Sequence, residues 1–194
     1  MGLRASAARG STAAIGVLAA AALGLSASPA SAKVSDGYVR GYDTYVGDWG
    51  DEGVISAGEF PVSNATCLWQ HILVAESVAK GNGSIFTVHD IDGHFGPNTT
   101  YATRRLQVKW GLADSFSEAD GRVGPNTFGR ADDELVKTGG STARGEVLEL
   151  RYPSGGSYNV LIRRSALGIY TFKGRDGNWH SASYPKAGAS TSCD

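Results

Sequence analysis

One turn sequence occurs twice in the chain, and this repetition constrains the fold more than any other feature. The first copy, DGHFGPNT, starts at Asp92, and the second, DGRVGPNT, starts at Asp120. In both copies Asp-Gly is typical of a tight turn. The Gly-Pro that follows is typical of a helix start, because proline at the first helical position loses no backbone hydrogen bond. The repeat therefore predicts two helices that begin in the same way, with Phe95 or Val123 buried ahead of each.

These starts place a unit of three helices over residues 66–137. Thr66 is predicted to cap the first helix, whose apolar run is CLWQHILVA. The second helix is predicted to begin at Pro97 and to stop at Gly111. The third is predicted to begin at Pro125.

The segment that follows the helices has the pattern of strands. Residues 146–194 contain EVLELRY, SYNVLIRR, GIYTFKG and GNWHSASY, which alternate apolar and polar positions and are separated by typical hairpin connectors. This predicts a β-meander of about four strands, preceded by a linker over residues 138–145. The predicted fold class is α+β, a small three-helix module followed by the meander. Because so small a sheet buries little alone, we expect it to dock against the rest of the chain.

Residues 33–65 are predicted to form an irregular arm. The aromatic residues Tyr38, Tyr42, Tyr45 and Trp49 recur at helical intervals, but five glycines interrupt residues 35–53. Each glycine costs about 1 kcal/mol in a helix, so no helix is expected. The aromatic rings are expected either to pack on the rest of the protein or to stack on sugar faces.

The N-terminus, residues 1–32, has the pattern of a signal peptide. Arg4 and Arg9 precede an apolar run that is short for a membrane span, and Ala-Ser-Ala ends the segment at Ala32. The sequence therefore predicts a secreted protein without a membrane anchor after cleavage. The remaining 162 residues hold 16 basic and 19 acidic residues, a balance that argues against nucleic acid or an anionic membrane as partner.

Both cysteines, Cys67 and Cys193, lie in the predicted mature chain. Two cysteines in an exported protein are expected to form a disulfide. A bridge between two chains is the alternative. We otherwise expect a monomer.

The sequence contains no pattern that predicts a catalytic residue, a metal or a cofactor. No Gly-x-Ser-x-Gly occurs, and HDIDGH over residues 89–94 matches neither the spacing of zinc ligands nor a complete calcium loop. A pair of carboxylates for glycoside cleavage meets only in the folded chain, so the sequence does not exclude glycoside hydrolysis.

Residues 67–135 resemble the peptidoglycan-binding domain, a three-helix module of bacterial cell-wall hydrolases. The resemblance rests on CLWQHIL, DGHFGPNTTYATRRLQVKWGL and DGRVGPNTF; the segments KGNGSIFTVHDI and ADSFSEA are longer than such modules usually have. The resemblance implies a groove between the first turn and the middle helix. The candidate ligand-binding residues are Asp92, Phe95, Asn98, Thr99, Thr103 and Gln107.

Each candidate has an expected role and a structural alternative. Asp92, Asn98 and Thr99 are expected to hydrogen-bond stem-peptide amides or sugar hydroxyls, and Thr103 and Gln107 to extend the polar stripe at one-turn spacing. Phe95 is expected to form an apolar floor. Capping, turn formation and core packing are the alternatives.

The resulting hypothesis is a secreted, noncatalytic protein that binds the peptidoglycan of the cell wall through the first copy of the turn. A secreted inhibitor or interaction protein for an extracellular enzyme is one alternative, and a cell-wall hydrolase with an unrecognised catalytic part is the other.

Overall fold

The chain has an α+β fold in the computed structural model, which describes residues 2, 37–155, 158–184 and 193. Apart from Gly2, the predicted signal peptide and residues 33–36 lie outside this description. The helices are α1 (Asn64–Ala75), the short 3-10 helix η2 (Val88–Asp90), α2 (Pro97–Lys109) and α3 (Pro125–Asp132). Along the described part of the chain, no helix is long and apolar enough to cross a membrane.

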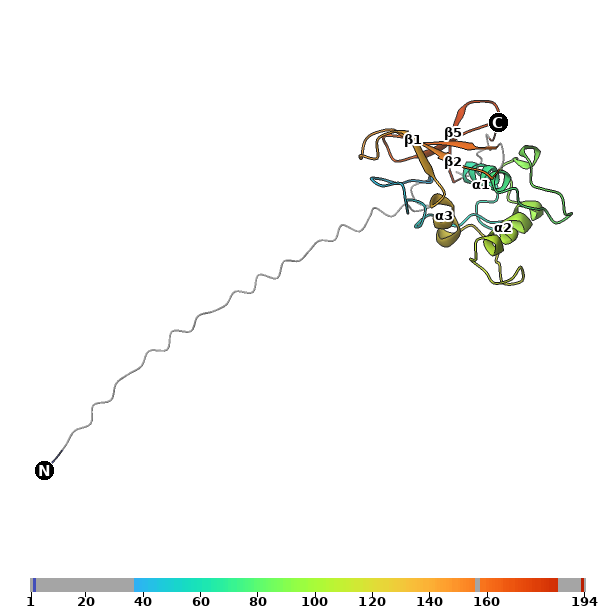
Figure 1. Cartoon of the computed structure of the whole chain (residues 1–194), viewed down its shortest axis with the longest axis horizontal. Coiled ribbons are helices and arrows are strands. Elements are labelled where there is room, and N and C mark those ends of the chain that lie inside the picture. The colour runs from blue at the N-terminus through green and yellow to red at the C-terminus, as the bar shows by residue number, and fades with distance from the viewer. Residues whose placement is uncertain (1, 3–36, 156–157, 185–192, 194) are drawn as a thin grey trace.

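Helix α1 lies between the sheet and α2, as Figure 1 shows, and contacts both. Every residue from Ala65 to Ala75 is therefore buried. The predicted cap is wrong by one turn: Ser63 caps the helix, and its Oγ accepts a hydrogen bond from the amide of Thr66 at 3.0 Å. Ser63 takes this position because its backbone is extended, whereas Thr66 already lies in the first turn.

The other two helices begin as the repeated turn predicts. Gly96 and Gly124 are the N-cap residues, and Pro97 and Pro125 occupy the first helical position. Helix α2 ends before Gly111, whose φ of 70° is the left-handed conformation that terminates many helices.

The sheet contains five antiparallel strands in the order β1-β2-β3-β4-β5, one more than predicted. The strands are β1 (Val136–Gly140), β2 (Leu148–Tyr152), β3 (Val160–Arg164), β4 (Tyr170–Lys173) and β5 (Trp179–Ser181). The extra strand, β1, covers the end of the predicted helical unit and the start of the predicted linker. Its sequence VKTGG does not alternate, because β1 is an edge strand that buries no side chain and its pairing with β2 is irregular after Lys137.

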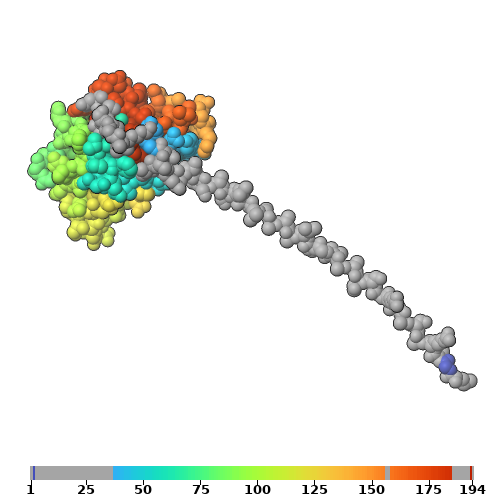
Figure 2. All heavy atoms as spheres, turned by 180° about the vertical axis from the view of Figure 1, so that it is seen from behind, coloured from blue at the N-terminus to red at the C-terminus, as the bar shows by residue number. Residues whose placement is uncertain are grey.

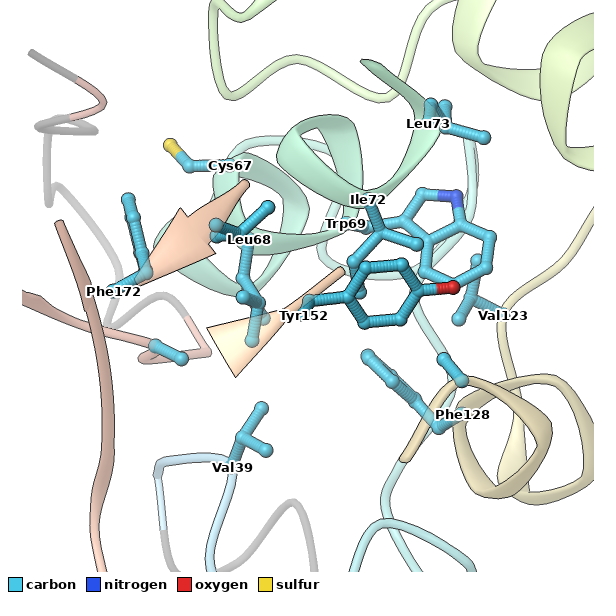
Figure 3. Close-up of a cluster of buried hydrophobic side chains, with 14 of the residues drawn as sticks. Val39, Cys67, Leu68, Trp69, Ile72, Leu73, Val123, Phe128, Tyr152 and Phe172 are labelled. Carbon is cyan, nitrogen blue, oxygen red and sulfur yellow. The ribbon is translucent and has the colours of Figure 1, made fainter. Parts of the chain in front are cut away.

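One hydrophobic core joins the arm, the helices and the sheet. It includes Val39 of the arm, Leu68 and Ile72 of α1, and Tyr152 and Phe172 of the sheet. Figure 3 shows Tyr152 between Ile72 on α1 and Phe128 on α3. The sheet thus buries its inner face on the helices, which agrees with the expectation that it docks.

The arm is irregular, as predicted, and lies beside the sheet (Figure 2). Isolated β-bridges join Tyr38 to Ser183 and Arg40 to Ile169. Trp49 is fully buried, with its ring centroid 5.3 Å from that of Tyr170 in the sheet. For Trp49, packing is therefore the role that the fold gives the ring.

A disulfide joins Cys67 of α1 to Cys193, with a Cα–Cα distance of 5.4 Å. The predicted intrachain pairing is confirmed. The two residues are 126 positions apart, so the bond ties the end of the chain to the central helix. Such bonds are typical of proteins in oxidising compartments.

Candidate functional site

The first turn is held by Gln70, a buried side chain of α1. Its Nε2 donates to Asp92 Oδ1 at 2.7 Å, to the His94 carbonyl at 3.0 Å and to Thr99 Oγ1 at 3.2 Å. Its Oε1 accepts from the amides of Asp92 and Gly93 at 3.0 and 2.8 Å. A single amide side chain therefore satisfies both ends of the turn and the start of α2.

Gln107 of α2 holds the second turn in the same way. Its Nε2 donates to Asp120 Oδ1 at 2.7 Å, to the Arg122 carbonyl at 2.9 Å and to Thr127 Oγ1 at 3.2 Å. Its Oε1 accepts from the Gly121 amide at 2.9 Å. The repeated unit is thus longer than the turn: it consists of a glutamine on one helix and the turn that starts the next.

The arm supports both turns from the opposite side through backbone hydrogen bonds. The Phe95 amide donates to the Pro61 carbonyl at 2.6 Å, and the amides of Ile55 and Val123 donate to each other's carbonyls at 3.0 Å. Phe95 and Val123 are both buried, as the sequence predicts. Each turn is therefore fixed by a helix on one side and by the arm on the other.

Most of the predicted groove residues face the interior. The exposed fractions are 2% for Phe95, 2% for Thr99, 0% for Thr103 and 5% for Gln107. Thr103 Oγ1 accepts a hydrogen bond from Trp69 Nε1 at 2.9 Å and donates to the Thr99 carbonyl at 2.8 Å. The expectation of an exposed polar stripe along α2 is wrong, because these side chains hydrogen-bond to α1 and to the turns instead of to solvent. Asp92 and Asn98 are exposed.

A hollow of about 290 Å³ lies at the second turn, where α3 begins. Its lining residues come from the turn, the first turn of α3 and the arm: Val54, Asp120, Arg122, Gly124, Pro125, Asn126 and Thr127. A neighbouring hollow of about 240 Å³ shares Asp120, Asn126 and Thr127 with it and extends to Leu112 and Ala113. Asp120 and Asn126 line both hollows and are exposed, so they lie at the boundary between them.

The start of α3 makes this hollow suited to hydrogen-bond acceptors. Gly124 offers no side-chain cap, and the amides of Asn126 and Thr127 belong to the first turn, where a helix leaves its N–H groups without intrahelical partners. The helix dipole adds partial positive charge at this end. Arg122 lies at the rim with its Nη2 at 2.5 Å from Glu59 Oε2 of the arm, which holds the guanidinium beside the hollow.

The sequence carried a signal for part of this site. Asp120 and Asn126 match Asp92 and Asn98 in the repeat, so the second copy is as good a candidate as the first. In the sequence, the first copy is favoured as the binding site because it leads into a longer helix with Thr103 and Gln107 at one-turn spacing. In the fold these polar side chains are buried. Val54 has no signal in the sequence, because only the bridge between the arm and the second turn brings it there.

Comparison with known proteins gives no relative: no protein-family model, curated protein or solved structure matches this chain.

Proposed function

We propose that this is a secreted, noncatalytic protein that binds peptidoglycan, and that the hollow at the second turn is its binding site. The observation that carries the proposal is an exposed hollow at an uncapped helix start, lined by polar groups on a turn that is fixed from two sides. Small-ligand sites are usually concave and pre-formed, with a few convergent polar groups that fix the orientation of the ligand.

The chemistry of the lining matches a peptide stem or an acetylated amino sugar. The Asn126 side chain both donates and accepts, as an amide ligand requires. The start of α3 favours carbonyl oxygens, whereas Arg122 is already paired with Glu59 and adds a guanidinium edge at the rim. Pro125 and Val54 add apolar surface for a methyl group or a sugar face. Asp120 Oδ1 accepts from Gln107 and from the Arg122 amide, so this carboxylate shapes the turn and supports a binding role rather than proton transfer.

Retention on insoluble peptidoglycan tests this proposal, with Asn126→Ala compared with the matched variant Asn98→Ala. Both asparagines are exposed at the second position of a helix, one in each copy of the turn. We expect the wild type to sediment with the walls without reducing their turbidity. Asn126→Ala should weaken retention about tenfold, equivalent to about 1.4 kcal/mol, and Asn98→Ala should retain it.

Each other outcome contradicts part of the proposal. Loss of retention only in Asn98→Ala would place the site at the first turn. Equal losses would remove the assignment to one hollow. A fall in turbidity would favour the hydrolase, and a wild type that stays in the supernatant would favour the secreted inhibitor.

A further inference from the structure

The outer face of the sheet is basic and carries an exposed aromatic ring. Alternation along β3, β4 and β5 places Leu161, Arg163, Lys173 and Trp179 on this face, opposite the core. The side chains of Leu161 and Trp179 are 44% and 36% exposed. Such apolar groups among cations distinguish this face from an ordinary solvated sheet surface.

Two cations flank the Trp179 ring. The Arg163 guanidinium carbon lies 4.3 Å from the ring centroid, and Lys173 Nζ lies 5.9 Å from it. Glu149 accepts a hydrogen bond from Arg163 at 3.0 Å and holds this guanidinium in place. Cation–π contacts of this kind fix the indole at the surface, where its exposed part is available to a planar or ring-shaped ligand.

A hollow of about 260 Å³ continues from this face toward α1. Its lining includes His71, Tyr158, Asn159, Lys173 and Arg175. The Arg175 Nη1 donates to the Val88 carbonyl of η2 at 3.0 Å, which positions the guanidinium at the rim. Lys173 belongs to both the hollow and the Trp179 contact, so the two features form one continuous surface.

The floor of this hollow offers a fixed hydroxyl. The Tyr158 hydroxyl hydrogen-bonds His71 Nδ1, and the two rings stack with an interplanar angle of 12°. Burial raises the pKa of Tyr158 to about 12, while Arg175 lowers it. The phenol therefore keeps its proton at neutral pH.

Charge is distributed unequally between the two halves of the fold. Residues 136–184 hold seven basic and three acidic residues, whereas residues 37–135 hold seven basic and fourteen acidic residues. Of the acids near this surface, Glu149 is paired with Arg163, and Asp176 is paired with His180 at 3.0 Å. Not all of these cations lie on the outer face, because Arg164 is buried beside Asp48. Arg163, Lys173 and Arg175 do lie at this face and its hollow, and their positive charge favours an anionic ligand.

We propose that this face binds an acidic saccharide, a sugar chain that carries carboxylate or phosphate groups. A sugar ring stacks on Trp179, and its oxyanion enters the hollow beside Lys173 and Arg175. The site is separate from the peptidoglycan hollow at the second turn and does not depend on it. Lysine and arginine side chains bind carboxylate and phosphate in the same way, through charge-assisted hydrogen bonds to the oxyanion.

Titration of the full mature protein with soluble saccharides tests the proposal. The probes are an oligogalacturonate, its neutral methyl ester, a phosphorylated mannose oligosaccharide and polyglutamate. Binding is measured by calorimetry and by changes in the amide chemical shifts of the protein. We expect binding of one or both acidic saccharides, weakened by salt, with shifts on β3, β4 and β5. The variants Lys173→Gln and Trp179→Ala should each weaken it about tenfold, and Arg105→Gln, which removes an exposed cation from α2, should not.

The probes distinguish the outcomes. Preference for the oligogalacturonate or for the phosphorylated saccharide identifies the anion. Equal binding of the methyl ester would overturn the role of the cations, and equal binding of polyglutamate with no effect of Trp179→Ala would overturn the assignment to a saccharide. Asn126→Ala should bind the acidic saccharide like the wild type, so failure of the peptidoglycan proposal leaves this result unaffected.

Discussion

At the scale of single residues, Gln107 is a structural link and not a surface contact. Replacing it with alanine removes the donor that serves Asp120, the Arg122 carbonyl and Thr127. Because buried polar groups that lose their partner cost about 1–3 kcal/mol, we expect Gln107→Ala to lower the free energy of unfolding by about that amount. Urea unfolding measures the change.

Arg105→Ala on the same helix is the control, because Arg105 is exposed. Its effect should stay within about 0.5 kcal/mol. If Gln107→Ala were equally mild, the hydrogen bonds to the second turn would not stabilise the fold. The sequence alone predicts the opposite for Gln107, a binding role with little effect on stability.

The reason for that difference is physical. A glutamine one turn after a threonine has the same local pattern whether it faces solvent or the backbone of a turn 13 residues later. The burial of Phe95 and Val123 was predictable, because an apolar side chain in a fixed turn has one favourable direction. The partner of Gln107 was not, because it depends on how the second turn folds back against α2.

At the scale of elements, the edge of the sheet is shaped by glycine. Gly140 ends β1 with a φ of 69°, and a Cβ there would lie 2.2 Å from the Val147 carbonyl oxygen of the paired segment. Gly140→Ala therefore has to move β1 away from β2. We expect it to lower the free energy of unfolding by about 3 kcal/mol, measured by urea unfolding.

Gly145→Ala is the matched control for this turn. Gly145 also has a positive φ, 86°, but a Cβ there has no neighbour within 4 Å. It should cost only the conformational strain of a left-handed residue, about 1 kcal/mol. Equal effects of the two variants would mean that the β1–β2 pairing adjusts to the side chain.

The same geometry explains which elements were predictable. The sequences of β2, β3 and β4 alternate apolar and polar residues because one face of each strand is buried. Gly-Pro marks the start of α2 and of α3. Strand β1 has neither signal, since its residues are exposed and it pairs only through its backbone with β2. Its existence follows from the sheet that it joins.

At the scale of the whole molecule, buried charges connect the arm to the sheet and to α3. Arg164 is 2% exposed and donates to Asp48 Oδ2 at 2.7 Å and to the Asp43 carbonyl at 2.7 Å. Asp132 of α3 accepts hydrogen bonds from the Trp49 amide at 2.6 Å and from the Gly47 amide at 3.1 Å. The loop of residues 43–49 is thus fixed by polar contacts on two sides.

Asp132 makes the stability of this assembly depend on pH. Burial raises the pKa of Asp132 to about 6 from the ordinary 3.8, although its two backbone donors lower it. The unfolded chain releases this proton at a lower pH than the folded chain. The contribution of Asp132 to the free energy of unfolding therefore falls as pH rises from about 4 to 6 and then stays level. The expected loss from this group is about 3 kcal/mol.

Urea unfolding between pH 4 and 7.5 measures this dependence, with Asp132→Asn as the comparison. Asparagine does not ionise, so the variant should lack this part of the slope, whatever its absolute stability. Burial also raises the pKa of Asp48, which leaves a slope of the same sign in the variant. Parallel curves for the two proteins would contradict the assignment to Asp132.

The disulfide acts on the largest scale, because it closes residues 67–193, which include α2, α3 and the five strands, into one loop. Cys67 and Cys193 are 126 residues apart, and the described chain contains no free cysteine. In the chain-entropy view, removing a bond of this span lets the unfolded state expand and costs about 5 kcal/mol. We expect the double variant Cys67→Ser, Cys193→Ser to lose stability on this scale in urea.

The denaturant dependence separates this mechanism from damage to α1. If the bond acts on the unfolded chain, the variant unfolds with a steeper dependence on urea, because its unfolded state exposes more surface. A loss of stability with an unchanged dependence would indicate that serine disturbs the packing around Cys67 instead. Two reactive thiols in the unreduced wild type would contradict the bond itself, and with it the attachment of the chain end to the central helix.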